Sequence, residues 1–378
     1  ALVAADRSAE SAFASLKYLF LGTIGASLYL TGVGYAFLAT GTLNMLELQT
    51  ALAEVGYDDT LVRTAYGLVV VGLGLKVAQF PLHTWQPDAY QRAPDSVTMY
   101  ISALVSTVAA YALARITYTV FTVEFLTTTR ILADGVLVLA GLSIVVGSAL
   151  AAVQTDLKRL FAYSSIAQFG IVVAAVALAN ETALLGGMVH LLGHGLMKGG
   201  LFLAVGMFGL GYGVRTVDDL AGLGTRAPYT AGGMAVLGLT LVGVPPSVGF
   251  VGKWYVAVGA VESGRWPIAI VIFLSTLLTL AYVARILERL YFASPEPARS
   301  VAPGDEGASA VAADGSGTVD ERPERSEADA AGEDPAGERL TPGMLAVLLL
   351  AAVLAVALGF GGVGFAELFD PVLGRFFT

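Results

Sequence analysis

The chain has no cysteine and only three histidines in 378 residues. The absence of cysteine excludes a disulfide framework, a thiolate-bound metal and thiol chemistry. Charge is also scarce, because Asp, Glu, Lys and Arg make up 13% of the chain, against roughly 25% in soluble domains. Hydrophobic residues make up 56%. This composition is typical of an all-α protein that crosses a membrane several times.

Nine stretches are apolar enough to cross a bilayer, for which a helix needs about 20 mainly apolar residues. They cover residues 16–39, 62–82, 97–118, 131–153, 157–179, 182–210, 230–258, 267–291 and 342–365. We expect a membrane domain of eight helices (residues 1–293), an acidic linker (294–341), and a C-terminal helix with its tail (342–378). No soluble catalytic domain remains, so we expect no cofactor, no bound metal and no nucleic acid. The protein is at most a translocase subunit with no redox site of its own.

The linker is acidic and of low complexity. Twelve of the 30 acidic residues lie between Glu296 and Glu338, so the net charge of −9 comes largely from this segment. Because few apolar residues are available to offset the entropy of ordering, we expect a disordered spacer. A regulatory docking tail is the alternative.

Basic residues near the span ends form two groups, which predict the orientation. The first group is Arg7, Lys17, Arg92, Lys158, Arg159, Arg215, Arg226, Arg285, Arg289 and Arg299, and the second is Arg63, Arg115, Arg130, Arg265 and Arg375. The larger group should face the cytoplasm. This places the N-terminus and the linker inside the cell, the C-terminus outside, and the protein in the plasma membrane.

Lysine is rare, with five lysines to sixteen arginines, yet three lysines fall deep inside predicted spans: Lys76, Lys198 and Lys253. A charge at membrane depth is costly and marks a candidate functional site. Arginine keeps its charge, whereas a buried lysine can lose its proton. The choice of lysine therefore favours groups that titrate over permanent charges.

Two of these lysines accompany prolines that should interrupt their helices. Lys76 lies five residues before Pro81, and Lys253 follows Pro245 and Pro246. Proline cannot donate the helical hydrogen bond, and broken spans line ion sites in transporters. The shared pattern suggests a repeated unit. For Lys253, snorkelling to the interface beside Trp254 is the alternative.

His190, His194 and Lys198 recur every four residues, so they should share one helix stripe about 12 Å long. Imidazoles that lead to an amine can pass protons, so we interpret the stripe as a proton relay. Each histidine could instead satisfy a buried carbonyl. Zinc would fit the first two positions, but no nearby carboxylate completes such a site.

Polar residues flank these features. Trp85 and Asp88 follow Pro81, and we expect an interfacial anchor and a helix or loop cap, respectively, with proton donation as the alternative for Asp88. Asp156 should cap the span that follows it. Lys158 and Arg159 should be cytoplasmic surface charges, with a role in an access funnel as the alternative.

Four motifs in order resemble the antiporter-like membrane subunits. They are GLKVAQFPLHTWQPDA (74–89), QTDLKRLFAYSSIAQ (154–168), HLLGHGLMKGGLFL (190–203) and GVPPSVGFVGKW (243–254). That family contains Mrp-type cation/proton antiporters, the proton-pumping subunits of complex I and relatives in membrane-bound hydrogenases. The resemblance implies two inverted five-helix repeats, each with a broken helix. Lys76 and Lys253 would be the lysines of the two breaks, and the stripe between them the relay.

The chain departs from the family pattern in two places. The family pairs the first lysine with a glutamate on an earlier helix. This chain starts at Ala1 with what reads as the tail of an apolar helix, so we expect that helix to be absent, in a fragment or a split subunit. Thr107 stands where a lysine or histidine is common and cannot hold a proton's charge. Both departures favour, as one alternative, a structural subunit that no longer conducts, whereas the three buried lysines argue against it.

The sequence most resembles the D-type subunit of an Mrp antiporter, working with other membrane subunits. Protons would enter near Lys76 from the cytoplasm, pass Lys198, His194 and His190, and leave near Lys253, with transport of Na⁺ left open. The first alternative is a proton-pumping subunit of an NADH-quinone oxidoreductase or a hydrogenase. No residue in the chain chooses between the two.

Overall fold

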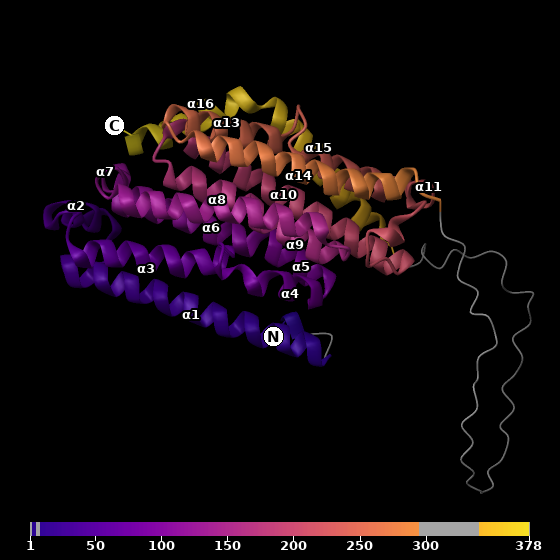
Figure 1. Cartoon of the computed structure of the whole chain (residues 1–378), viewed down its shortest axis with the longest axis horizontal. Helices are drawn as coiled ribbons and strands as arrows, with labels where there is room; N and C mark the ends of the chain where they lie inside the picture. The colour runs from indigo at the N-terminus through magenta and orange to yellow at the C-terminus, as the bar shows by residue number, and fades with distance from the viewer. Residues whose placement is uncertain (1, 5–7, 295–339, 378) are drawn as a thin grey trace, which may run out of the picture.

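The computed structural model describes residues 2–4, 8–294 and 340–377. In these ranges the chain forms a bundle of helices along one long axis and contains no strand (Figure 1). Eight of its helical segments are long and apolar enough to cross a membrane. A ninth span is split into two shorter helices, so the nine predicted spans are all present. Residues 295–339 of the predicted linker lie outside the described residues.

The helices are of two kinds, long ones of at least 15 residues and shorter ones. The long ones are α1 (Ala9–Thr40), α3 (Thr60–Val77), α8 (Arg130–Val153), α9 (Leu157–Ala177), α10 (Glu181–Tyr212), α12 (Pro228–Val242), α13 (Val248–Glu262), α14 (Trp266–Tyr291), α15 (Pro342–Phe360) and α16 (Gly362–Phe377). The third span is built from α5 (Asp95–Tyr100), η3 (Ile101–Val105), α6 (Ser106–Ile116), η4 (Thr117–Phe121) and α7 (Thr122–Thr128). The short elements are η1 (Leu2–Ala4), α2 (Met45–Val55), η2 (Leu82–Thr84), α4 (Trp85–Arg92), η5 (Asp218–Leu220) and α11 (Leu223–Arg226).

Glycines let neighbouring helices approach to backbone contact. A Cβ added at Gly72 of α3 would lie 2.6 Å from the backbone nitrogen of Tyr29 in α1. A Cβ at Gly147 of α8 would lie 2.6 Å from the nitrogen of Ala167 in α9. Small residues allow such contact in membranes, where helix association depends on close packing. The glycines therefore determine which spans are neighbours.

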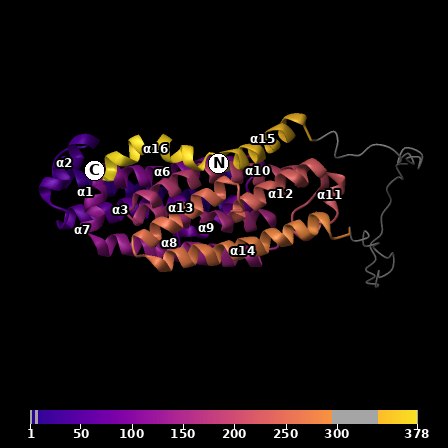
Figure 2. The ribbon, with the colours of Figure 1, turned by 90° about the horizontal axis from the view of Figure 1, so that it is seen from above.

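Helix α9 forms the centre of the bundle, surrounded by α8, α10 and α14 (Figure 2). Over its most apolar stretch, 94% of α9 is buried inside the protein, whereas α1 and α15 bury only 17% of theirs. A helix that is apolar all round and lies in the middle of the bundle has no lipid-facing side. Polar side chains on α9 therefore have to find partners inside the protein.

Both predicted helix breaks are present, and the backbone follows a similar course at each of them. Helix α3 ends one residue before Ala78, which has φ +60°, and Pro81 follows three residues later. Helix α12 ends one residue before Gly243, which has φ +92°, and Pro246 follows three residues later. The prolines cannot supply the next helical donor, so each helix stops and its last carbonyls lose their usual partners. The shared path agrees with a repeated unit.

The third span is less regular than the predicted continuous helix. Two five-residue turns, η3 and η4, are wound as π-helix, with hydrogen bonds that skip an extra residue. Such turns are rare and occur often at functional sites. A Cβ at Gly195 of α10 would lie 3.2 Å from the carbonyl oxygen of Ala103 in η3. The irregular turn therefore lies directly against α10.

Ion pairs show at which end of the bundle the basic residues of each predicted group lie. At one end Lys17 and Arg159 both contact Asp88, at 2.7 and 3.2 Å. At the other end Arg265 contacts Asp134 at 2.5 Å. The short helices α4, α5 and α11 lie toward the first end, and α2, α7 and the end of α16 lie at the second (Figure 1). The described members of the two basic groups in these ion pairs thus lie at opposite ends of the bundle, which agrees with opposite faces of a membrane.

Candidate functional site

The predicted stripe on α10 is deeply buried. His190, His194 and Lys198 each have 0% of their surface exposed. Lys198 donates from Nζ to the carbonyl oxygen of Phe161 at 2.9 Å and to the hydroxyl of Ser164, both on α9. Its ammonium also lies 5.4 Å from the centre of the Phe161 ring. Every partner of this lysine is uncharged.

The two histidines differ in their surroundings. His190 lies 3.0 Å from Oε1 of Gln168, measured at Nε2, while its Nδ1 has no partner among the described residues. Both nitrogens of His194 are buried and have no partner in the part of the chain that the structure describes, and its ring lies 4.3 Å from that of Phe169. Buried polar atoms normally have a hydrogen bond, to protein or to ordered water. These imidazoles are therefore suited to exchange protons with internal water.

Lys253 is held by the second break. It is 5% exposed, and its Nζ donates to the carbonyl oxygens of Leu241 and Val242, at 2.8 and 3.0 Å. These are carbonyls from the last turn of α12, which carry the negative end of the helix dipole. The lysine therefore faces inward, and the predicted alternative of snorkelling to the interface is wrong.

A glycine brings Lys253 beside the stripe. A Cβ at Gly252 would lie 2.6 Å from Cβ of His190 and 2.9 Å from its backbone nitrogen. Helix α13 therefore touches α10 at His190, one residue before Lys253. A cavity of about 110 Å³ between α12, α13 and α14 also reaches Lys253, and Trp254 and Thr276 line it. The packing of α13 on α10 makes one cluster of Lys198, the histidines and Lys253.

Lys76 does not join this cluster. Its side chain is half-buried and faces α1, where its Nζ lies 5.9 Å from the centre of the Tyr18 ring. A Cβ at Gly22 would lie 3.1 Å from the same atom. Among the described residues Lys76 has no hydrogen bond and no carboxylate partner. The expectation of a deeply buried lysine is therefore wrong here, because the lipid-facing helix α1 covers it only in part.

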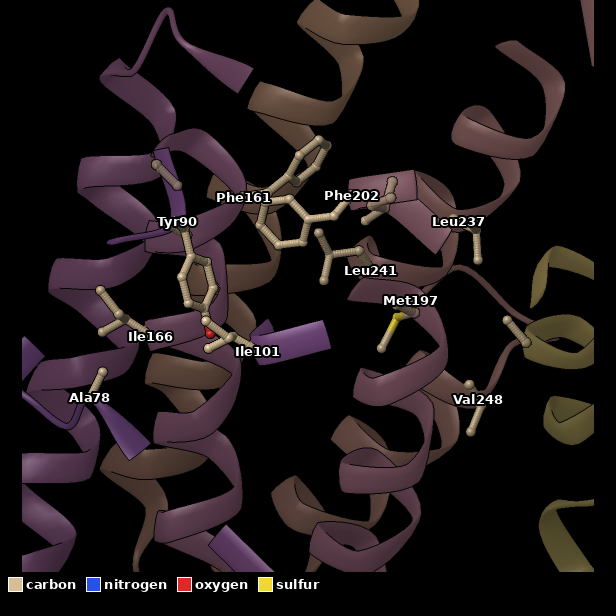
Figure 3. Close-up of a cluster of buried hydrophobic side chains, with 14 of the residues drawn as sticks. Ala78, Tyr90, Ile101, Phe161, Ile166, Met197, Phe202, Leu237, Leu241 and Val248 are labelled. Carbon is tan, nitrogen blue, oxygen red and sulfur yellow. The ribbon is translucent and has the colours of Figure 1, made fainter. Parts of the chain in front are cut away.

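Aromatic rings fill the space between Lys76 and Lys198. Starting at Tyr18, the contacts run through Trp85, Tyr90, Phe202 and Phe161, with ring centres 5.0 to 6.3 Å apart. The last three of these rings lie close together in Figure 3. The side chains of Phe161 and Phe202 have no group that can bind or release a proton, so a proton path between the lysines would have to pass beside these two rings.

The position of Trp85 in this aromatic row differs from the prediction of an interfacial anchor. This residue is 2% exposed, not interfacial, and its Nε1 donates to the carbonyl oxygen of Leu75 at 2.8 Å. The break after α3 removes the helical donor of that carbonyl, and the indole N–H replaces it.

Asp156 caps α9 as predicted, accepting from the backbone nitrogen of Arg159. Lys158 differs from prediction. It is 5% exposed and donates to Asp95 at 2.8 Å and to the carbonyl of Ala93 at 2.6 Å. It joins α9 to the start of α5 and is not a surface charge. Asp88 ion-pairs with two cations and caps no helix among the described elements.

Sequence reasoning missed several polar residues of the site. Ser164 and Gln168 contact the stripe from α9, and their spacing of four residues in an apolar helix was a signal. Gln79 and Gln86 are buried near the first break, and neither amide has a partner among the described residues. The hydroxyl of Thr107 is likewise buried and unpaired. No described group of three metal-ligating side chains accompanies the histidines, so nothing supports the zinc alternative.

Comparison with known sequences identifies relatives. Residues 2–279 match the family described as NADH:quinone oxidoreductase/Mrp antiporter, transmembrane region. NADH-quinone oxidoreductase subunit N of Desulforudis audaxviator is 41% identical over 300 residues, covering 78% of this chain and 59% of that protein. Subunit N of Geotalea uraniireducens is 33% identical over 291 residues, covering 77% and 61%. The chain thus spans about three fifths of the length of these curated relatives.

Solved structures show the same fold. An archaeal membrane-bound sulfane sulfur reductase contains a chain with a TM-score of 0.81 and 28% identity, covering 99% of this chain and 68% of its own. A chain of the Mrp complex of Dietzia sp. DQ12-45-1b matches with a TM-score of 0.78 and 26% identity, covering 97% of this chain and 70% of its own. A chain of respiratory complex I of Thermus thermophilus matches with a TM-score of 0.68 and 26% identity, covering 97% of this chain and 70% of its own.

These matches confirm the resemblance read from the four motifs and the all-α membrane fold with two broken helices. The relatives are multi-pass subunits of larger membrane complexes. Those named above by sequence are oxidoreductase subunits N, so the D-type Mrp subunit is not specifically supported and the first alternative is favoured. The chain belongs to the NADH:quinone oxidoreductase/Mrp antiporter family of membrane subunits.

Proposed function

We propose that this chain is a proton-translocating membrane subunit of an NADH-quinone oxidoreductase, similar to subunit N. The observation that carries the proposal is the buried cluster on α10 and α13. There, two lysines and two histidines lie deep in the bundle with only uncharged partners. Identity of 41% to a subunit N supports the choice of complex. Its partners would be other membrane subunits, in the plasma membrane, with the C-terminus outside.

Protons would move along Lys198, His194, His190 and Lys253. The first three share one stripe of α10, and Gly252 brings the fourth against His190. Positive charge on Lys198 and Lys253 at the same time would be unfavourable, because like charges repel in a medium of low dielectric constant. Protonation of one lysine therefore favours loss of a proton from the other, which couples the two ends of the cluster. Lys76 would serve the uptake side, with water beside Gln79 and Gln86 bridging the aromatic row.

The test uses the assembled complex in inverted membrane vesicles, with NADH-driven acidification followed by a pH-sensitive dye. Lys253→Ala and Lys76→Ala should abolish this subunit's contribution to acidification, whereas Lys17→Ala, a change at a half-exposed ion pair, should leave it unchanged. Assembly is checked by the NADH oxidation rate with an artificial electron acceptor. Wild-type proton flux in either lysine variant would rule out the proposal.

The same vesicles distinguish the Mrp-type function. If added Na⁺ collapses a preformed proton gradient without NADH, and Lys253→Ala prevents this, the chain works as an antiporter subunit. Absence of any proton flux with an intact complex would favour the structural alternative.

A further inference from the structure

Two adjoining cavities lie at the second end of the bundle, away from the cluster of lysines and histidines. The larger, about 460 Å³, lies between α6, η4, α10 and α16 and is mostly apolar, with Leu184, Phe369 and Leu373 on its walls. The smaller, about 400 Å³, lies between α2, α6, η4 and α16; Arg375 lines it, and Arg115 lines both cavities. Both are bounded by Tyr118 and Phe376, whose rings lie 5.7 Å apart. Together they form a site with one charged end and one apolar end.

The charged end has no counter-ion among the side chains that the structure describes. Within the described residues, neither guanidinium has a carboxylate partner, and no acidic residue lines either cavity. Two other arginines at this end differ, because Arg63 pairs with Asp58 and Arg265 with Asp134. Guanidinium groups bind phosphate through paired, charge-assisted hydrogen bonds. The cavity therefore has the chemistry to take up a phosphate from outside the chain.

We propose that the two cavities bind one anionic phospholipid, with its phosphate at Arg115 and Arg375 and an acyl chain along Leu373. A lipid is favoured over a free phosphate because the apolar cavity continues directly from the charged one. A mainly apolar cavity with a few polar groups is the usual form of a small-molecule site.

The site would also anchor α16. This helix supplies Arg375 and much of the apolar wall, so a lipid bound there joins the C-terminal helix to α6 and α10 (Figure 2). The proposal is independent of proton transport, because none of its residues belongs to the buried cluster.

The experiment uses the purified, delipidated full-length chain and native mass spectrometry. Palmitoyl-oleoyl phosphatidylglycerol, the matching phosphatidylcholine and inorganic phosphate are each titrated. We expect one phosphatidylglycerol to bind at least tenfold more tightly than phosphatidylcholine. The double variant Arg115→Gln and Arg375→Gln should remove this preference, and Arg130→Gln, an exposed arginine outside both cavities, should retain it.

A second variant separates the lipid from a free anion. Ala114 lines only the apolar cavity, so Ala114→Leu narrows the space for an acyl chain without changing the charge. This variant should bind phosphatidylglycerol at least fivefold more weakly than the wild type does. Equal binding of both lipids, or phosphatidylglycerol binding unchanged in the double arginine variant, would overturn the proposal. So would full competition by millimolar phosphate, which would indicate a small-anion site and is decisive even if Ala114→Leu does not fold.

Discussion

Lys253 donates a hydrogen bond of 2.8 Å from Nζ to the carbonyl oxygen of Leu241, across the break between α12 and α13. The acceptor is the uncharged end of a helix, not a carboxylate. Lys198 is likewise held by a carbonyl and a hydroxyl. A neutral acceptor leaves no unpaired buried anion behind when the lysine loses its proton. By contrast, Lys158 contacts Asp95 and would leave that carboxylate unpaired.

The requirement for deprotonation can be tested with Lys253→Arg. Arginine can still donate to the carbonyls of α12, but it does not lose its proton in proteins. We expect proton flux in assembled vesicles to fall at least tenfold while the amount of complex stays at the wild-type level. Lys17→Arg makes the same substitution outside the buried cluster and should leave the proton flux unchanged. Normal flux in Lys253→Arg would mean that a fixed charge is enough.

The glycine contact at His190 predicts a large difference between two Gly→Ala changes. At Gly252 the new methyl group would lie 2.6 Å from Cβ of His190, which forces α13 away from α10. Overpacking of this kind costs about 1–3 kcal/mol. At Gly232 of α12 nothing lies within 4 Å, and Ala should be neutral or stabilising by about 1 kcal/mol. Thermal unfolding in detergent measures both, and equal melting temperatures would contradict the contact.

Ser164 and Ser165 offer a matched pair beside Lys198. Both hydroxyls bond to the carbonyl of Phe161, but only Ser164 also accepts from the lysine. Ser164→Ala should cost about 1–3 kcal/mol, because a buried donor loses a partner, and should slow proton flux. Ser165→Ala should change both values much less. The comparison fails if the two variants behave alike in denaturation and in flux.

The pair between Lys158 and Asp95 should contribute more to stability than the exposed pair between Arg63 and Asp58. Asp95→Asn leaves the ammonium of the buried Lys158 without its counter-ion. The cost should approach about 3 kcal/mol, the low end for a broken buried pair, since Asp95 itself is partly exposed. Asp58→Asn, at side chains 43% and 81% exposed, should cost less than about 1 kcal/mol. Chemical denaturation at equal ionic strength measures the free energy of unfolding of both variants. An equal or larger loss in Asp58→Asn would contradict the prediction.

The breaks and the α10 stripe could be predicted from the sequence because both follow from local rules. Pro81 and Pro246 lack the N–H of the helical ladder wherever the helix lies, and residues four apart share a face in any helix. The partners of the stripe could not be predicted in this way. Gln168 meets His190 and Phe161 meets Lys198 only because α9 packs against α10 at one depth.

The errors have the same origin. Trp85 and Lys158 are residue types that usually lie at a membrane surface, yet both are buried. Each reaches a backbone carbonyl on another element, Leu75 and Ala93, respectively. Lys76 differs in the opposite direction, because its side chain is only partly buried where it faces α1. Burial depends on which helix lies next to the residue, and residue type alone does not decide that.

The sequence by itself therefore determined the membrane class, the nine spans, the two interruptions and the positions of the rare lysines. These depend on local hydrophobicity, proline and helical period. Only the tertiary structure decided which charges share a site, since contacts between α9, α10 and α13 join residues far apart in the chain. Glycines at those contacts, Gly252 above all, let α13 approach α10 closely at His190, one residue before Lys253.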